Sequence, residues 1–192
     1  MSVLGWRLRT VGAAAVACAL LVVSSGCGDD DGEAADEGTT TSTSETTVAS
    51  TTTTQDPEAE VEAAYLAYWE MAERLAQDPN PDDPEIAERT TGSNREQVVD
   101  TLSTLRAQKR AIRFGAAYAH SVLAVDLSER SAVVRDCSVD DATTIDVSTN
   151  EPISEGVATL LLEATLTREG SQWLVETIDQ VQVWEGATNC DI

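Results

Sequence analysis

The chain of 192 residues carries 34 acidic and 12 basic side chains, a formal net charge of −22. This acidity argues against nucleic-acid binding, because few side chains could neutralise a run of phosphates. It also argues against lying flat on an anionic membrane surface. We interpret the charge as favouring solubility and repulsion between copies, rather than as a site for a cationic partner.

Residues 1–26 have the three parts of a secretory signal: two arginines, an apolar run over 11–23, and small residues leading to Cys27. The apolar run is too short to cross a hydrocarbon core of about 30 Å, which favours a cleaved signal. Its ending resembles the lipobox of bacterial lipoproteins, with Ser24 where Leu or Val is usual. An ordinary secretory signal and an uncleaved anchor are the alternatives.

The lipobox resemblance implies that Cys27 carries fatty acyl chains such as palmitate, and that the chain is held on the extracytoplasmic face of the cell membrane. Residues 27–55 are acidic at first and then rich in Thr and Ser, with almost no apolar side chains. Such a segment cannot bury enough apolar surface to offset its ordering entropy. We predict a disordered tether between the lipid anchor and the rest of the chain.

Residues 56–192 are long enough for one domain with a real core and too short for two. After export and lipidation, Cys137 and Cys190 are the cysteines that remain. Two cysteines in an exported domain most simply pair, which predicts a disulfide bond. His120 is neither close to the cysteines nor patterned with them, so no zinc site is expected.

Helices are predicted over the first half of the domain. Asp56 is a good N-cap and Pro57 fits the first helical position, with an apolar and aromatic stripe following over 61–76. Prolines end this helix within 77–84. Residues 78–82 imitate the opening of a calcium loop, but Gly is missing from its sixth position and Glu from its twelfth. We therefore expect no metal.

Two further helices are predicted before the spacing of apolar residues changes from helical to strand-like. A short one covers about 85–89, and a longer one runs from Ser93 to about Lys109, with Ser93 and Glu96 forming a capping box. Four β-rich runs follow, over about 112–126, 132–139, 157–168 and 172–184.

The last two runs are predicted to form a hairpin. If Arg168 faces Ser171, Asp179 lies on the apolar face of the sheet. A carboxylate there lines a pocket, bonds to a partner, or shows that the register is wrong by one residue.

Helices followed by a curved antiparallel sheet of about four strands predict an α+β domain. Residues 56–192 also carry a set of short motifs, which are Ala64-Tyr65, Tyr68-Trp69, Pro81 to Pro84, Thr91-Gly92, Ala132 to Cys137, Asp140-Asp141, Trp173 to Val175 and Cys190. In these the chain resembles actinobacterial lipoproteins with a nuclear transport factor 2-like domain, a cone-shaped α+β fold. The resemblance implies several possible activities, since the superfamily includes dehydratases, isomerases, ligand carriers and interaction modules that often dimerise.

Asp179, Tyr65, Tyr118 and His120 are the candidates for acid–base chemistry, but no spacing ties them together. We expect no enzyme activity and no cofactor.

The leading interpretation is a lipid-anchored interaction module of the cell envelope, binding itself or an envelope protein. An outward patch of Leu161, Ile178 and Trp184 would carry the contact. The alternative is a carrier that holds a small apolar ligand in the cone. The residues expected around that ligand are Tyr65, Trp69, Trp173 and Asp179.

Overall fold

The computed structural model describes residues 56–190. Within them three helices come first: α1 (Pro57–Gln77), α2 (Glu85–Arg89) and α3 (Gly92–Ala107). The strands that follow are β1 (Arg110–Arg113), β2 (Ala119–Leu127), β3 (Ser131–Asp140), β4 (Thr143–Asp146), β5 (Pro152–Ser154), β6 (Ala158–Glu169) and β7 (Gln172–Glu185). They form a four-stranded sheet in the order β2-β3-β6-β7 and a three-stranded sheet in the order β1-β4-β5. Neighbouring strands are antiparallel throughout.

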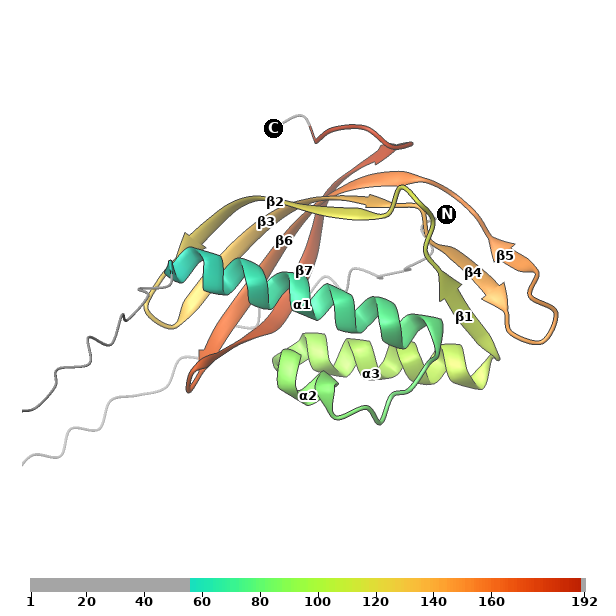
Figure 1. Ribbon diagram of the computed structural model, residues 1–192, viewed down its shortest axis with the longest axis horizontal. Coiled ribbons are helices and arrows are strands. Elements are labelled where there is room, and N and C mark those ends of the chain that lie inside the picture. The colour runs from blue at the N-terminus through green and yellow to red at the C-terminus, as the bar shows by residue number, and fades with distance from the viewer. Residues whose placement is uncertain (1–55, 191–192) are drawn as a thin grey trace, which may run out of the picture. The chain divides into compact units, whose positions relative to one another are not determined.

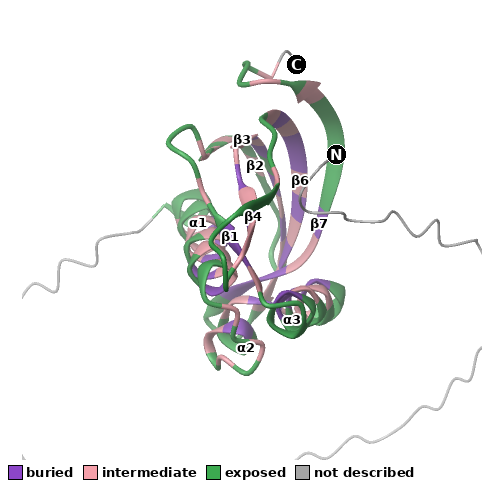
Figure 2. Cartoon of the chain, turned by 90° about the vertical axis from the view of Figure 1, so that its right-hand side faces the viewer, coloured by how far each residue is buried: buried purple, intermediate pink, exposed green. Residues whose placement is uncertain are grey.

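The larger sheet curves over the helices, with α1 crossing its inner face and α3 lying beside α1 (Figure 1). Buried residues gather where the helices meet the sheet, while the far end of β7 is exposed (Figure 2). The core side chains of α1 are Val61, Tyr65, Tyr68, Met71 and Leu75. The predicted α+β class, with N-terminal helices packed on a curved antiparallel sheet, is confirmed.

The helix starts differ in how well the sequence predicted them. The Asp56 carboxylate accepts the Glu58 N–H at 3.1 Å, and Pro57 is the first helical residue of α1, as expected. The capping box proposed for α3 is wrong, because its N-cap is Thr91 and no side chain caps the helix. The Ser93 hydroxyl instead donates to the backbone oxygen of Glu176 on β7. A tertiary contact has replaced the local cap.

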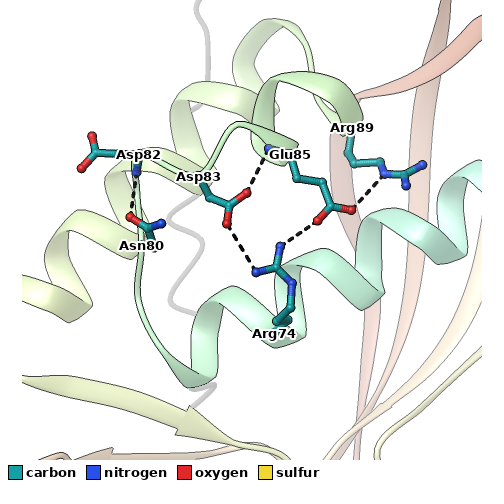
Figure 3. Close-up of polar contacts among 6 residues, drawn as sticks. All are labelled: Arg74, Asn80, Asp82, Asp83, Glu85 and Arg89. Atoms are coloured by element: carbon teal, nitrogen blue, oxygen red, sulfur yellow. Dashed lines mark hydrogen bonds and ion pairs between the residues drawn. The ribbon is translucent and has the colours of Figure 1, made fainter.

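The acidic turn between α1 and α2 is held by arginines (Figure 3). Arg74 on α1 pairs with Asp83 at 3.3 Å and with Glu85 at 2.7 Å, and Glu85 also pairs with Arg89. Because these pairs are solvent-exposed, each contributes at most about 1 kcal/mol. The network joins the end of α1 to the start of α2.

The strands depart from the prediction in two places. The run expected over 112–126 is interrupted at 114–118, so that β1 and β2 belong to different sheets. β4 and β5 were not predicted, because they have only four and three residues and lack a clear apolar alternation. They add the second sheet beside the predicted four-stranded one.

The register of the last hairpin is corrected by its turn. Glu169 pairs with Gln172, so the turn residues are Gly170 and Ser171, and Arg168 faces Trp173 instead of Ser171. Gly170 has φ +62°, a conformation that glycine adopts at little cost. The hairpin therefore closes with a two-residue turn.

A bulge in β7 then exchanges the faces of that strand. Leu166 pairs with Val175 but Thr165 pairs with Thr177, which leaves Glu176 as an extra residue. Ile178 consequently packs in the core with 6% of its surface exposed, and Asp179 is exposed. The prediction that Asp179 faces the core is wrong.

The C-terminal segment returns along the outer face of the larger sheet. Cys137 on β3 is bonded to Cys190, with 5.8 Å between their Cα atoms, so the predicted disulfide is confirmed. The Thr159 hydroxyl also donates to the Gly186 backbone oxygen at 2.9 Å and accepts the Thr188 N–H at 2.8 Å. These contacts fix the chain end to the sheet.

The outward patch predicted from sequence is not present. Leu161 is only 8% exposed, on the side of the sheet where the C-terminal segment returns. Ile178 is buried in the core and Trp184 is half-buried. The patch fails because the bulge and the disulfide-bonded segment both change which residues meet solvent.

Candidate functional site

A cavity of about 120 Å³ lies between α1, α3, the 114–118 loop and the inner face of the larger sheet. An engineered apolar cavity of about 150 Å³ in another protein accepts benzene, so this space suits a small organic molecule. The apolar side chains on its wall are Trp69, Ala72, Ala76, Val98, Leu102, Ile112, Phe114, Ala142, Leu160, Leu162 and Ile178. An apolar wall with a few polar groups is typical of a small-molecule site.

The polar part of the wall is organised around His120 and Asp136. The His120 Nδ1 lies 2.5 Å from Asp136 Oδ2, and the two side chains are 6% and 0% exposed. The Tyr65 hydroxyl donates to the same oxygen at 2.9 Å, and the Ser121 N–H donates to Oδ1 at 2.8 Å. The Asp136 side chain is therefore fixed by contacts to three different residues.

Asp136 determines which nitrogen of His120 carries the proton. Because a carboxylate only accepts, Nδ1 must be the donor in this pair. The opposite nitrogen, Nε2, lies 3.0 Å from the Tyr118 hydroxyl, and in a histidine protonated at Nδ1 alone it accepts a hydrogen bond from that hydroxyl. The result is a chain of hydrogen bonds from Tyr118 through His120 to Asp136, with Tyr118 and His120 on the cavity wall.

Strand pairing brings the two central residues together. His120 on β2 is paired with Ser138, and Val122 is paired with Asp136 on β3. His120 and Asp136 are therefore diagonal neighbours on one face of the sheet, close enough for side-chain contact. That face is the inner one, against α1.

Two residues of α1 complete the setting of His120. Tyr65 and Trp69 are four residues apart and so lie on the same side of the helix. The Trp69 ring stacks on the His120 ring with 4.2 Å between centroids and 22° between planes. Tyr65 meets both rings edge-on, with its hydroxyl on Asp136. The imidazole is thus fixed by packing as well as by hydrogen bonds.

The 114–118 loop brings Phe114 and Tyr118 to the cavity. Its backbone is held by Asp141, whose carboxylate accepts the Gly115 N–H at 3.0 Å and the Ala117 N–H at 2.8 Å. Gly115 is required here, since a Cβ atom would lie 2.2 Å from Asp141 Oδ2. Asp141 therefore fixes the position of Tyr118 without touching the cavity.

The buried tyrosines act as neutral hydroxyls. Burial raises the pKa of Tyr65 far above its usual value, and the Asp136 carboxylate raises it further. Burial is also the main reason that the pKa of Tyr68 is raised, and its hydroxyl donates to Asn94 Oδ1 at 3.4 Å. The pKa of Tyr118 is raised first by burial and then by nearby carboxylates.

Two further carboxylates line the cavity. Glu73 lies one helical turn after Trp69 on α1, and Asp140 is the last residue of β3. Burial raises the pKa of both carboxyl groups above the usual range. The charged wall of the site is therefore acidic.

The predicted pocket residues fall in different places. Trp69 lines the cavity, and Tyr65 lies behind it on Asp136. Trp173 packs in the core near Arg168, whose guanidinium carbon lies 5.6 Å from the ring centroid. Asp179 is exposed and paired with Glu163. The structure thus brings Tyr65 and Trp69 together at the cavity, whereas Trp173 and Asp179 do not line it.

Tyr118 and His120, which the sequence offered only as unconnected candidates, are neighbours in the site. Asp136, Glu73 and Asp140 were missed as site residues. A signal for Asp136 exists: it lies at an alternate position of β3 after Ala132 and Val134, both buried, so a polar residue occurs on an apolar face. Such a residue needs a buried partner.

Several expectations lie outside the site. Cys27 and the tether at 27–55 are outside the described residues. Within residues 56–190, no group of three or more His, Cys, Asp or Glu side chains is arranged to hold a metal ion. In the same range, no helix is long and apolar enough to cross a membrane.

No protein-family model and no curated protein matches the chain. Among solved structures it is similar to the intermembrane space region of chloroplast protein ARC6, with a TM-score of 0.54 and 15% identity over 66% of this chain and 97% of that chain. A putative scytalone dehydratase from Novosphingobium aromaticivorans aligns with a TM-score of 0.39 and 14% identity, over 66% of this chain and 88% of that chain. The first likeness shows a shared fold alone. The second is too weak to support an argument.

Proposed function

We propose that the domain binds a small, largely apolar molecule in the cavity between α1, α3 and the larger sheet. One observation carries the proposal: an apolar cavity has Tyr118 and His120 on its wall, and both belong to a hydrogen-bonded chain that ends on the buried Asp136 behind them. The apolar wall supplies affinity through burial, and the fixed polar groups select and orient the ligand.

The hydrogen-bonding roles define what the ligand must offer. The Tyr118 hydroxyl can turn from His120 toward a ligand acceptor, and His120 Nε2 can then accept a hydrogen bond from a ligand donor. Asp136 holds the imidazole in that tautomer throughout, because its carboxylate accepts the hydrogen bond from Nδ1–H. A ligand with one hydroxyl, amine or carbonyl group at the end of an apolar body meets these requirements.

We also propose that the domain is carried on the outside of the cell membrane by a lipid on Cys27, as the lipobox resemblance predicts. Two acyl chains give stable anchoring where one is marginal. Replacing Cys27 with Ala should move the protein from the membrane fraction to the soluble or secreted fraction. Unchanged membrane fractionation of Cys27→Ala would contradict the anchor.

Native mass spectrometry tests ligand binding directly. The full chain, purified from a bacterial host that exports it, is compared before and after denaturation. A reproducible extra mass that is lost on denaturation supports the proposal. Ala72→Phe should abolish the adduct by filling the cavity, whereas Ala63→Phe, at an exposed position of the same helix, should keep it. A bare mass for the wild-type protein contradicts it.

A second candidate function, acid–base catalysis, is favoured by one feature of the same site. His120 has its Nδ1 fixed on a buried carboxylate and its Nε2 on the cavity side next to Tyr118. Nε2 could take a proton from a bound molecule while Asp136 stabilises the resulting imidazolium. If so, the bound molecule should exchange a carbon-bound proton with deuterated water in the wild-type protein and not in His120→Gln. Equal exchange in both contradicts catalysis by His120.

A further inference from the structure

The fixed charges on the cavity wall all have one sign. Glu73 and Asp140 line it, and Asp136 lies directly behind His120. None of the Lys and Arg side chains of residues 56–190 lines the cavity. An anionic ligand would therefore meet negative charge in a partly buried space, where repulsion is poorly screened.

Neither wall carboxylate forms an ion pair with a Lys or Arg side chain of residues 56–190. Asp140 accepts one hydrogen bond, from the Ala142 N–H at 3.0 Å. The Glu73 carboxylate forms no hydrogen bond or ion pair within residues 56–190. Both residues are partly buried, and burial raises the pKa of each carboxyl group. A cation in the cavity would offset this cost.

Both carboxylates lie near the Tyr118 hydroxyl on the cavity wall. Glu73 and Asp140 are the charges that, after burial, most raise the pKa of Tyr118. The charge of a protonated His120 would lower the pKa of both carboxyl groups. Since these side chains come from α1, β3, β2 and the 114–118 loop, they surround the cavity from separate elements.

Aromatic rings also line the cavity. Phe114 and Tyr118 have ring centroids 4.5 Å apart and are tilted by 58°, and Trp69 also faces the cavity. The electron-rich faces of such rings attract cations within about 6 Å, and aromatic cages recognise quaternary ammonium groups.

We propose that the cavity takes an organic cation, an amine or quaternary ammonium group on a small apolar body, with Glu73 and Asp140 as its counter-ions. This rests on the proposed function, since it assigns the charge of the ligand that the cavity binds. The apolar body packs against the aliphatic wall contributed by α3 and the sheet. The cationic group lies between the two carboxylates and the rings of Phe114 and Tyr118.

The test compares three probes of similar size and different charge on the full-length protein. Benzyltrimethylammonium is the cation, neopentylbenzene its neutral isostere, and phenylacetate the anion. Dissociation constants are measured by isothermal titration calorimetry at pH 7. The cation should bind about tenfold more tightly than the neutral isostere, as expected for a cation–π contact assisted by a carboxylate, and the anion should bind most weakly.

Variants assign the preference to the wall carboxylates. Glu73→Gln and Asp140→Asn should each weaken cation binding severalfold and leave binding of the neutral probe within twofold. Glu62→Gln removes the same charge from an exposed position about three turns earlier on α1 and should change neither. Circular dichroism of each variant checks that the fold is kept.

The outcomes separate this proposal from the one on which it rests. If the neutral probe binds as tightly as the cation, or Glu73→Gln and Asp140→Asn both keep the wild-type preference, the cation assignment is wrong and the small-molecule cavity stands. If none of the three probes binds, the cation assignment is wrong, and native mass spectrometry decides separately whether the cavity binds a small molecule. Binding of the anion in preference to the cation would also overturn the charge assignment.

Discussion

The buried bond between Tyr65 and Asp136 can be measured by a double-mutant cycle. Asp136→Ala removes the acceptor of the Tyr65 hydroxyl, the His120 Nδ1–H and the Ser121 N–H. An unsatisfied buried donor costs about 1–3 kcal/mol, and breaking a buried charged network costs about 3–5 kcal/mol. We expect the free energy of unfolding to fall by about 3–5 kcal/mol.

Tyr65→Phe alone should lower the free energy of unfolding by about 1.5–3 kcal/mol, because it deletes a hydrogen bond to a charged group. In the Asp136→Ala background the same change should cost much less, since the hydroxyl has already lost its acceptor. The coupling energy should therefore be about 1–2 kcal/mol. Urea unfolding followed by tryptophan fluorescence, with the disulfide intact, gives the four free energies.

Tyr68 provides the matched control for this cycle. Like Tyr65 it is buried on α1, but its hydroxyl donates to Asn94 and not to Asp136. Tyr68→Phe and Asp136→Ala should therefore be additive within about 0.5 kcal/mol. A Tyr65–Asp136 coupling no larger than the Tyr68–Asp136 coupling would refute the hydrogen-bond chain described for the site.

Three further predictions address the loop, the disulfide and the acidic wall. Gly115→Ala should lower the free energy of unfolding by about 1–3 kcal/mol and weaken ligand binding, because the added Cβ displaces Asp141. Urea unfolding measures the first effect and calorimetry the second. Gly156→Ala is the control, since its Cβ would lie in open space. Replacing Cys137 and Cys190 with Ser should cost about 4 kcal/mol in the chain-entropy model, seen as a lower urea midpoint, and an unchanged midpoint would contradict it. The pKa of Glu73 is higher in the folded protein than in the unfolded chain. Ionised Glu73 therefore lowers the free energy of unfolding at pH values above its folded pKa. This loss of stability is absent below the unfolded pKa of about 4.3. Glu73→Gln should therefore unfold at higher urea than wild type at pH 7, with the difference disappearing below about pH 4, and equal or lower stability at pH 7 would oppose this.

The parts of the fold that sequence predicted well depend on local chemistry. Asp56 and Pro57 start α1 by capping and by a fixed φ, and the prolines after Gln77 end it. Cys137 and Cys190 were paired correctly because they are the two cysteines of the predicted domain at 56–192, which leaves one combination. These signals act within a few residues or by elimination, so distant contacts do not change them.

The parts that failed depend on contacts distant in sequence. Asp179 was placed on the core face because a strict alternation was assumed, and the bulge at Glu176 exchanged the faces. Ser93 was assigned to a cap but bonds to β7 instead. Sequence periodicity cannot place an unpaired residue in a ladder, since the choice is made by packing on both faces of the sheet.

The site itself was predicted only in part for the same reason. Tyr65 and Trp69 follow from the helical stripe of α1, and both contact His120. The pairing of His120 with Asp136 requires the register of β2 on β3, which contains its own bulge between Val122 and Ala124. A diagonal pair across such strands cannot be read from spacing along the chain.

Nitrogen-15 NMR of His120 tests the central claim most directly, because the chain contains a single histidine and a preparation without a histidine tag gives one imidazole signal set. The site predicts that His120 Nδ1 carries a proton bonded to Asp136 in the free protein, and that the Nε2 signal changes when benzyltrimethylammonium or neopentylbenzene is added. An imidazole whose Nδ1 carries no proton, and whose signals respond to neither probe, would contradict a ligand cavity built around His120 and Asp136.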